Sequence, residues 1–243
     1  MTTKIPYVNL SKQWEKERED LLPILDRVLA SGQYVGGPSI AEFEENIKRV
    51  CGVKYAIALN SGTDALVCGL IALGIGSGDE VITPPNSFIA STAAIIQVGA
   101  KPVFVDVQAD QNINIEMIEP AITDKTRAIM PIHLTGRVAN MSAISSIAMK
   151  YDIYIIEDAA QSIGSLHEKK PAGSLGNIGC FSTHPLKNLN ACGDGGFLTT
   201  NDQSIAEKIM LLRNHGLEDR NTVVHFGFVS RMDPLQAAIL NYR

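Results

Sequence analysis

The sequence has 243 residues, which is enough for one large domain or two small ones with a sizeable core. Hydrophobic residues make up 45% and charged residues 19% of the chain, the balance of an ordinary globular protein. The formal net charge of −5 excludes a broad basic surface, so we expect neither nucleic acid nor an anionic membrane as a partner.

The first part of the chain predicts two helices. Apolar residues recur at helical spacing over residues 12–30, with charged residues on the other side. The glycine-rich segment 31–37 ends this pattern, and Pro38 is well placed to open a second helix that runs to Val50. We therefore expect a helical segment within residues 1–52.

Strands and helices alternate regularly in the next hundred residues. The expected strands are 55–59, 80–83, 102–107, 128–134 and 153–156, and the expected helices are 63–73, 87–98, 115–122 and 141–151. A strand at 195–200 and a helix over about 202–213 follow. This alternation predicts a single α/β domain with a mostly parallel central sheet and helices on both faces.

The spacing of the cysteines and the length of the apolar stretches predict a cytoplasmic protein. The four cysteines are far apart, form no CxxC pair and have no histidine at zinc-ligand spacing, so we expect reduced thiols and no metal site. We recognise no signal peptide. The longest apolar stretch, residues 89–100, is interrupted by polar residues and is too short to cross a bilayer.

Ligands of open α/β sheets bind at the carboxyl ends of the strands, where the segment Asn60-Ser-Gly-Thr-Asp-Ala-Leu66 joins a predicted strand to a helix. Its small residues allow a phosphate to approach the unpaired N–H groups of the helix, and Thr63 adds a hydroxyl. The alternative is a simple helix cap by Ser61 or Thr63, without a ligand.

Two further strand ends carry candidate residues. Glu157 and Asp158 end a buried strand, and one of the two carboxylates must face the crevice. Asp158 could pair with a cation, bind a metal or cap the following turn, although no cluster of metal ligands is near it in sequence. Phe88 follows another strand and could either belong to the core or lie flat against a planar ring.

Lys187 lies in the glycine-rich segment 181–196 and could be a surface charge, a phosphate clamp or a nucleophile. A phosphate cradle, an aromatic face, a strand-end carboxylate and a loop lysine are together the parts that hold pyridoxal phosphate. The lysine forms a Schiff base with this cofactor, and an aspartate pairs with its pyridinium nitrogen.

The sequence resembles the DegT family of pyridoxal-phosphate-dependent nucleotide-sugar aminotransferases, which have fold type I of the aspartate aminotransferase superfamily. The segments that carry the resemblance are Asn60-Ser-Gly-Thr-Asp-Ala-Leu, Val103-Phe-Val-Asp-Val, Ile156-Glu-Asp-Ala-Ala-Gln, Phe181-Ser-Thr-His-Pro-Leu-Lys and Arg231-Met-Asp-Pro-Leu-Gln-Ala-Ala. The resemblance implies that residues 1–243 form the large, cofactor-binding domain and that the family's small C-terminal domain is absent from this chain.

The resemblance also implies a role for each candidate residue. Lys187 would form the Schiff base and then move a proton as a free amine, and Asp158 would keep the ring nitrogen protonated. Phe88 would lie against the ring, and Gln161 would lie beside the ring oxygen or Asp158. The residues implied to hold the phosphate are Gly62, Thr63 and Ser182.

The implied reaction transfers an amino group from an amino acid, typically glutamate, to a nucleotide-linked keto sugar, in amino-sugar biosynthesis for a surface polysaccharide or a secondary metabolite.

The family builds each site from two subunits, so a homodimer is implied, with segment 226–232 crossing over. Val229 stands where many members have an asparagine that reaches the neighbouring phosphate, and valine cannot donate that hydrogen bond. The alternatives are an inactive truncated or regulatory homologue that binds the cofactor, and a sugar dehydratase, whose family members lack the lysine.

Overall fold

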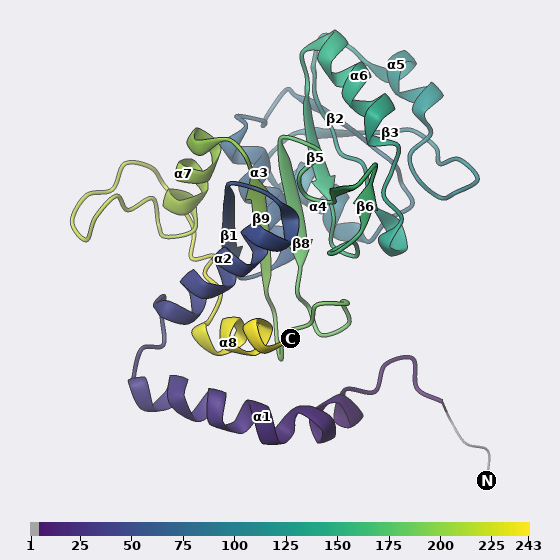
Figure 1. The fold of residues 1–243 in the computed structure, drawn as a ribbon. Coiled ribbons are helices and arrows are strands. Elements are labelled where there is room, and N and C mark those ends of the chain that lie inside the picture. Colours follow the sequence, from purple (N-terminus) through teal and green to yellow (C-terminus); the bar gives the residue numbers. More distant parts are fainter. Residues whose placement is uncertain (1–4) are drawn as a thin grey trace.

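The computed structural model describes residues 5–243, so the first four residues of the predicted N-terminal segment lie outside it (Figure 1). The helices are α1 (Leu10–Ser31), α2 (Pro38–Cys51), α3 (Gly62–Ala72), α4 (Ile89–Gln97), η1 (Ile115–Met117), α5 (Ile118–Ala121), η2 (Leu134–Gly136), α6 (Met141–Tyr151), α7 (Gln203–Leu212) and α8 (Pro234–Tyr242). The strands are β1 (Tyr55–Leu59), β2 (Glu80–Thr83), β3 (Lys101–Phe104), β4 (Thr126–Ile129), β5 (Tyr154–Asp158), β6 (Leu166–His167), β7 (Lys170–Pro171), β8 (Ile178–Ser182) and β9 (Gly196–Thr200).

Seven strands form one sheet in the order β1-β9-β8-β5-β4-β2-β3, and β6 and β7 form a separate hairpin. Strand β9 runs antiparallel to both of its neighbours, and the other neighbouring pairs are parallel. The strands other than β9 therefore end at the same edge of the sheet. The prediction of an α/β fold with a mostly parallel sheet is confirmed.

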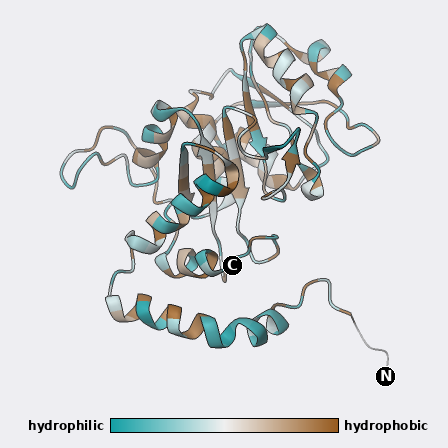
Figure 2. Cartoon of the chain, viewed as in Figure 1, coloured by the Kyte–Doolittle hydropathy of each residue, from teal (hydrophilic) through white to brown (hydrophobic). Residues whose placement is uncertain are grey.

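Helices cover both faces because successive residues of each strand point to opposite sides. Ile57 and Leu59 of β1 pack in a cluster with residues of α3, α4 and α7, whereas Ala56 and Ala58 pack with residues of α2 and α8. Helix α6 covers β4 and β5 on the second face. Figure 2 shows the hydrophobic residues concentrated in the strands and the helices that flank them.

Helix α1 confirms the predicted N-terminal helix, and its ends have clear causes. Asn9 caps the start by accepting a hydrogen bond from the N–H of Lys12 at 3.0 Å, and Gly32 ends the helix in the left-handed region at φ 68°. Leu21 is the one buried residue of α1, while Trp14 and Leu29 are exposed. None of the helices in the described part of the chain is long and apolar enough to cross a membrane.

Several of the predicted strand and helix boundaries were wrong. The strand predicted at 128–134 is β4, Thr126–Ile129, and the chain then leaves the regular ladder at Pro131, which has no N–H to donate. Strand β3 ends at Phe104 rather than at residue 107, and the helix predicted from residue 87 begins at Ile89. The helix predicted at 115–122 is a 3₁₀ turn followed by the short α5.

Candidate active site

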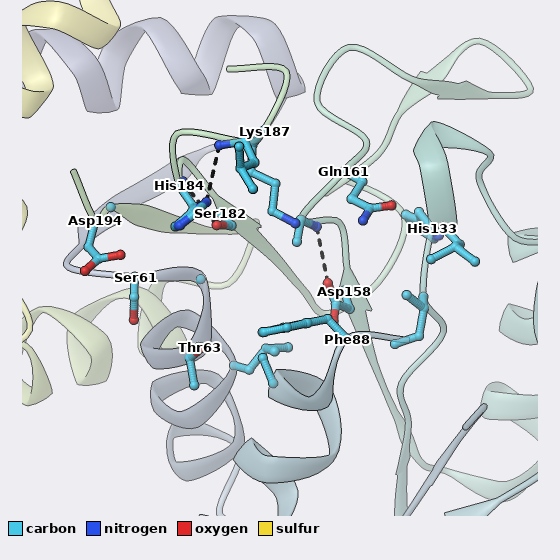
Figure 3. A pocket seen from close by; sticks show the side chains of 18 residues that line it. Ser61, Thr63, Phe88, His133, Asp158, Gln161, Ser182, His184, Lys187 and Asp194 are labelled. Carbon is cyan, nitrogen blue, oxygen red and sulfur yellow. Dashed lines mark hydrogen bonds between the residues drawn. The ribbon is translucent and has the colours of Figure 1, made fainter. Parts of the chain in front are cut away.

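A cavity of about 380 Å³ lies at the carboxyl ends of the parallel strands (Figure 3). Its walls include the segments that follow β1, β2, β4, β5 and β8, which the sheet order brings to one edge. The structure brings all seven sequence-predicted site residues together around this cavity. They are Gly62, Thr63, Phe88, Asp158, Gln161, Ser182 and Lys187.

The N-terminus of α3 forms one end of the cavity. Ser61 caps the helix, its hydroxyl oxygen accepting a hydrogen bond from the N–H of Asp64 at 3.0 Å, so the capping interpretation is correct for Ser61. A Cβ atom on Gly62 would lie 2.7 Å from the Cβ of Ser182, closer than side chains tolerate. Glycine at this position therefore lets the first N–H groups of α3 and the Ser182 hydroxyl lie side by side.

Asp158 faces the cavity and is nearly buried, with 7% of its surface exposed. It lies on the same face of β5 as Ile156, toward α3 and α4. Its Oδ2 accepts a hydrogen bond from the Ser91 hydroxyl at 2.6 Å, and its Oδ1 accepts one from the N–H of Ala160 at 3.2 Å. The carboxylate thus caps the following turn and also points at the cavity.

No cation pairs with Asp158 among residues 5–243. Over the same range no three His, Cys, Asp or Glu side chains are grouped so that they could hold a metal ion. Of the roles considered for this carboxylate, the described geometry shows the capping of the following turn. The carboxylate also lines the cavity, where it can accept a hydrogen bond from a ligand.

Glu157 points to the opposite face of β5 and forms a buried network that the sequence did not reveal. Its two carboxylate oxygens accept hydrogen bonds from the backbone N–H groups of Gly173, Leu175 and Gly176, at 2.7–2.8 Å. His133 Nε2 lies 3.0 Å from Glu157 Oε2. Because His133 Nδ1 accepts the N–H of Ala139 at 3.3 Å, the ring proton is on Nε2 and is donated to Glu157. This network fixes one wall of the cavity.

We expect Glu157→Gln to lower the free energy of unfolding by about 3 kcal/mol. The NH₂ group of glutamine is a donor, so it would face backbone N–H groups that are also donors and would leave them without an acceptor. Chemical denaturation followed by circular dichroism measures the change. The matched control is Glu116→Gln, an exposed side chain, for which the change should stay within about 0.5 kcal/mol. Equal stabilities of the two variants would contradict the structural role of Glu157.

Phe88 is 73% exposed and lines the cavity, so its interpretation as a core residue is wrong. It occupies the position before α4 in an extended conformation, which turns its ring out of the hydrophobic core. Figure 3 shows the ring beside Asp158, below the end of the Lys187 side chain. An exposed aromatic face here is suited to stacking on a planar ligand.

Lys187 is partly buried, and its side chain extends from its loop into the cavity, toward Phe88 and Asp158 (Figure 3). Its Nζ makes no hydrogen bond or ion pair within the described range 5–243. The Lys187 loop is fixed at its base, since the N–H of Thr183 donates to the carbonyl of Gly195 at 2.9 Å and the N–H of Ala191 to the carbonyl of Thr183 at 2.7 Å. A rigid loop therefore presents an amine to the cavity.

Gln161 lies at the end of the cavity opposite α3. Its Oε1 accepts a hydrogen bond from the backbone N–H of Thr135 at 2.6 Å, which leaves its NH₂ group as the donor available to a ligand. Thr135 has φ 55°, a left-handed conformation that is rare for a β-branched residue. The Gln161 side chain thus helps to hold a strained turn of the cavity wall.

The cysteines take no part in the cavity. All four are free, and Cys51, Cys68 and Cys180 are buried. Burial raises the pKa of the Cys51 and Cys68 thiols to about 12 and also raises the pKa of Cys180, which lies opposite Asp158 in the β5–β8 ladder. These three thiols are therefore protonated and unreactive at neutral pH.

The cavity combines an amine, a nearly buried carboxylate, an aromatic face and a helix N-terminus at one edge of an α/β sheet. This combination is typical of the pyridoxal-phosphate transferase class. Residues 15–243 match the family described as the DegT/DnrJ/EryC1/StrS aminotransferase family. The chain belongs to this family.

Two characterised relatives have similar sequences. One is the "Pleiotropic regulatory protein" of Geobacillus stearothermophilus, 40% identical over 98% of this chain and 64% of that protein. Another is the "UDP-2-acetamido-2-deoxy-3-oxo-D-glucuronate aminotransferase" of Pseudomonas aeruginosa, 41% identical over 97% of this chain and 66% of that protein. The chain therefore spans just under two thirds of the length of these relatives.

Two solved structures are similar to this chain in both fold and sequence. DesV of S. venezuelae, in complex with a ketimine intermediate, is 39% identical with a TM-score of 0.96, over 99% of this chain and 65% of that one. NtdA of Bacillus subtilis, with bound cofactor PMP, is 38% identical with a TM-score of 0.93, over 100% of this chain and 56% of that one.

Proposed function

We propose that the protein formed by this chain is a pyridoxal-phosphate-dependent aminotransferase that moves an amino group from glutamate to a nucleotide-linked keto sugar. The observation that carries the proposal is the Nζ of Lys187, which has no partner within residues 5–243, in a cavity that Asp158 and Phe88 also line. The names of several relatives support the substrate class, since they describe aminotransferases of UDP- and dTDP-linked sugars.

The residues of the cavity fit the cofactor. The close approach of Gly62 to Ser182 brings the N-terminus of α3 and the Ser182 hydroxyl to one end of the cavity. A phosphate bound there could accept hydrogen bonds from the first N–H groups of α3 and from the Thr63 hydroxyl. Phe88 can stack on the ring, and Asp158 can accept a hydrogen bond from the ring nitrogen. When bound, pyridoxal phosphate supplies an aldehyde that captures amines and a ring that withdraws electrons.

The protein's own groups then perform the proton transfers. The carboxylate of Asp158 holds a proton on the ring nitrogen, and its hydrogen bond from Ser91 fixes its orientation. Lys187 Nζ would hold the cofactor through its aldehyde, and as a free amine it would take a proton from the substrate's α-carbon. In the second half of the reaction Lys187 Nζ returns a proton to the carbon of the sugar that receives the amine.

Absorbance spectroscopy tests the proposal directly. The purified chain is mixed with pyridoxal phosphate, reduced with borohydride and digested, and mass spectrometry should find the cofactor on Lys187. Glutamate added before reduction should bleach the near-visible band, and a panel of nucleotide-linked keto sugars should restore it. A protein that shows no band would instead support a regulatory function, such as the name of the Geobacillus relative describes. A dehydratase is disfavoured because Lys187 is present.

We further propose a cytoplasmic homodimer that supplies amino sugars for a surface polysaccharide or a secondary metabolite. The loop between α7 and α8 projects from the molecule, and its side chain Phe226 is 99% exposed (Figure 1). Phe228 and Val229 are also exposed, so an apolar surface is open to a second copy. Light scattering should find a dimer, and a monomer with full cofactor occupancy would contradict the proposal.

A further inference from the structure

The cavity wall contains a hydrogen-bonding side chain to which no role has been given so far. His184 lies in the same loop as Lys187 and lines the cavity. Figure 3 shows its ring beside Ser182, on the side of the cavity where Ser61 and Asp194 lie and away from Gln161. His184 is thus placed at the end formed by the N-terminus of α3.

Local hydrogen bonds determine which groups of this loop can donate to a ligand. His184 Nδ1 accepts the N–H of Leu186 at 3.3 Å, so in the neutral ring the proton is on Nε2. The backbone N–H of His184 donates to the Ser182 hydroxyl oxygen at 3.3 Å, which leaves the hydroxyl hydrogen available. His184 Nε2–H and Ser182 O–H are therefore two donors with no acceptor among residues 5–243.

The charge of this end of the cavity makes the histidine significant. Lys187 is the one lysine among the lining residues, and no arginine lines the cavity within the described part of the chain. Asp194 also lines this end, and its carboxylate opposes any bound anion. The other lining histidine, His133, is already hydrogen-bonded to Glu157 and to the N–H of Ala139. His184 is consequently the lining histidine placed to donate to an anion at α3.

We propose that His184 is a phosphate ligand, its Nε2 donating to the phosphate group of the bound cofactor beside the Ser182 hydroxyl and the N–H groups of α3. This inference rests on the proposed function, because it takes pyridoxal phosphate as the ligand. It also explains how the chain holds the phosphate although Val229 offers no donor. A hydrogen bond to a charged oxygen corresponds to a change in affinity of roughly ten- to a hundredfold.

A comparison of two ligands isolates the phosphate end. The chain is titrated with pyridoxal phosphate and with pyridoxal, which lacks the phosphate, and binding is followed by absorbance at fixed pH and ionic strength. His184→Phe should weaken the binding of pyridoxal phosphate roughly ten- to a hundredfold and leave that of pyridoxal unchanged. His184→Gln, whose amide can reach the position of Nε2, should restore most of the affinity.

Two further variants calibrate the comparison. Thr63→Val removes a hydroxyl at the same end without changing its shape, so it should show the same ligand-selective loss. Asp194→Asn removes the opposing charge and should strengthen the binding of pyridoxal phosphate alone.

Unchanged affinity of His184→Phe for pyridoxal phosphate would overturn the assignment of His184. An equal loss for both ligands would also overturn it, since the ring would then act on the loop and not on the phosphate. If the unmodified chain binds neither compound, the proposed function itself fails. If it binds both and His184→Phe is normal, only the role of His184 is refuted.

Discussion

Lys187→Ala is expected to abolish the covalent attachment of pyridoxal phosphate and to lower the rate of transamination by roughly 10²–10⁴-fold or more. The reason is that Lys187 lines the cavity, and in the proposed function its Nζ both attaches the cofactor and moves the proton. The fold should be intact, because Nζ makes no hydrogen bond or ion pair within residues 5–243. Borohydride trapping with mass spectrometry, single-turnover kinetics and circular dichroism measure the three effects.

The matched control for this variant is Lys187→Arg, which keeps the positive charge and most of the length but not the nucleophile. Arginine stays protonated under all ordinary conditions and so can neither attach the cofactor nor accept a proton. It should therefore be as inactive as the alanine variant. A trapped cofactor in either variant would remove Lys187 from its proposed role.

Asp158→Asn should keep the cofactor bound but lower turnover by roughly a hundredfold, since a neutral amide cannot hold the ring nitrogen protonated. The exchange is sterically mild. The Asn Oδ1 can still accept the N–H of Ala160, and the Ser91 hydroxyl can reverse its role and accept from the new NH₂ group. Steady-state rates with glutamate, together with cofactor content after gel filtration, separate the loss of chemistry from the loss of binding.

The control makes the same chemical change at Asp124, an exposed residue of the turn that precedes β4. This turn lies at the amino end of β4, whereas the cavity lies at its carboxyl end. Asp124→Asn should have the activity of the unmodified chain. If Asp158→Asn also retained that activity, the partner of the ring nitrogen would have to be sought elsewhere.

Much of the composition of the candidate site could be predicted from the sequence, because the parallel sheet brings the strand ends together. Residues at the carboxyl ends of parallel strands meet at one edge, so Gly62, Phe88 and Asp158 could be placed together without knowledge of the strand order. Lys187 was harder, because it follows a strand that the apolar pattern alone did not mark. Alone it could be a surface charge, a phosphate clamp or a nucleophile, and only its combination with the other candidates favoured a Schiff-base lysine. The structure places it in the lining of the same cavity.

Other features required the tertiary structure. The sequence showed that either Glu157 or Asp158 faces the crevice, but only the register of β5 decides which. The network of Glu157 joins it to His133 and to a loop that begins sixteen residues later, and no local pattern signals such contacts. The apolar run that follows β4 was read as strand up to residue 134, whereas it bends away to form the cavity wall.

The reversed strand β9 has a consequence for how the protein reaches its final form. Strand β1, the first of the chain, lies at the edge of the sheet, and β9, the last, is its one neighbour there: Tyr55 pairs with Thr200. On a ribosome that adds about 5–20 residues per second, β1 waits for several seconds before its partner emerges. A Cβ on Gly196 would lie 2.3 Å from the carbonyl carbon of Ser61, so β9 also closes the base of the α3 N-terminus. The N-terminus of α3, where the phosphate is proposed to bind, therefore takes its final form only after β9 has joined the sheet.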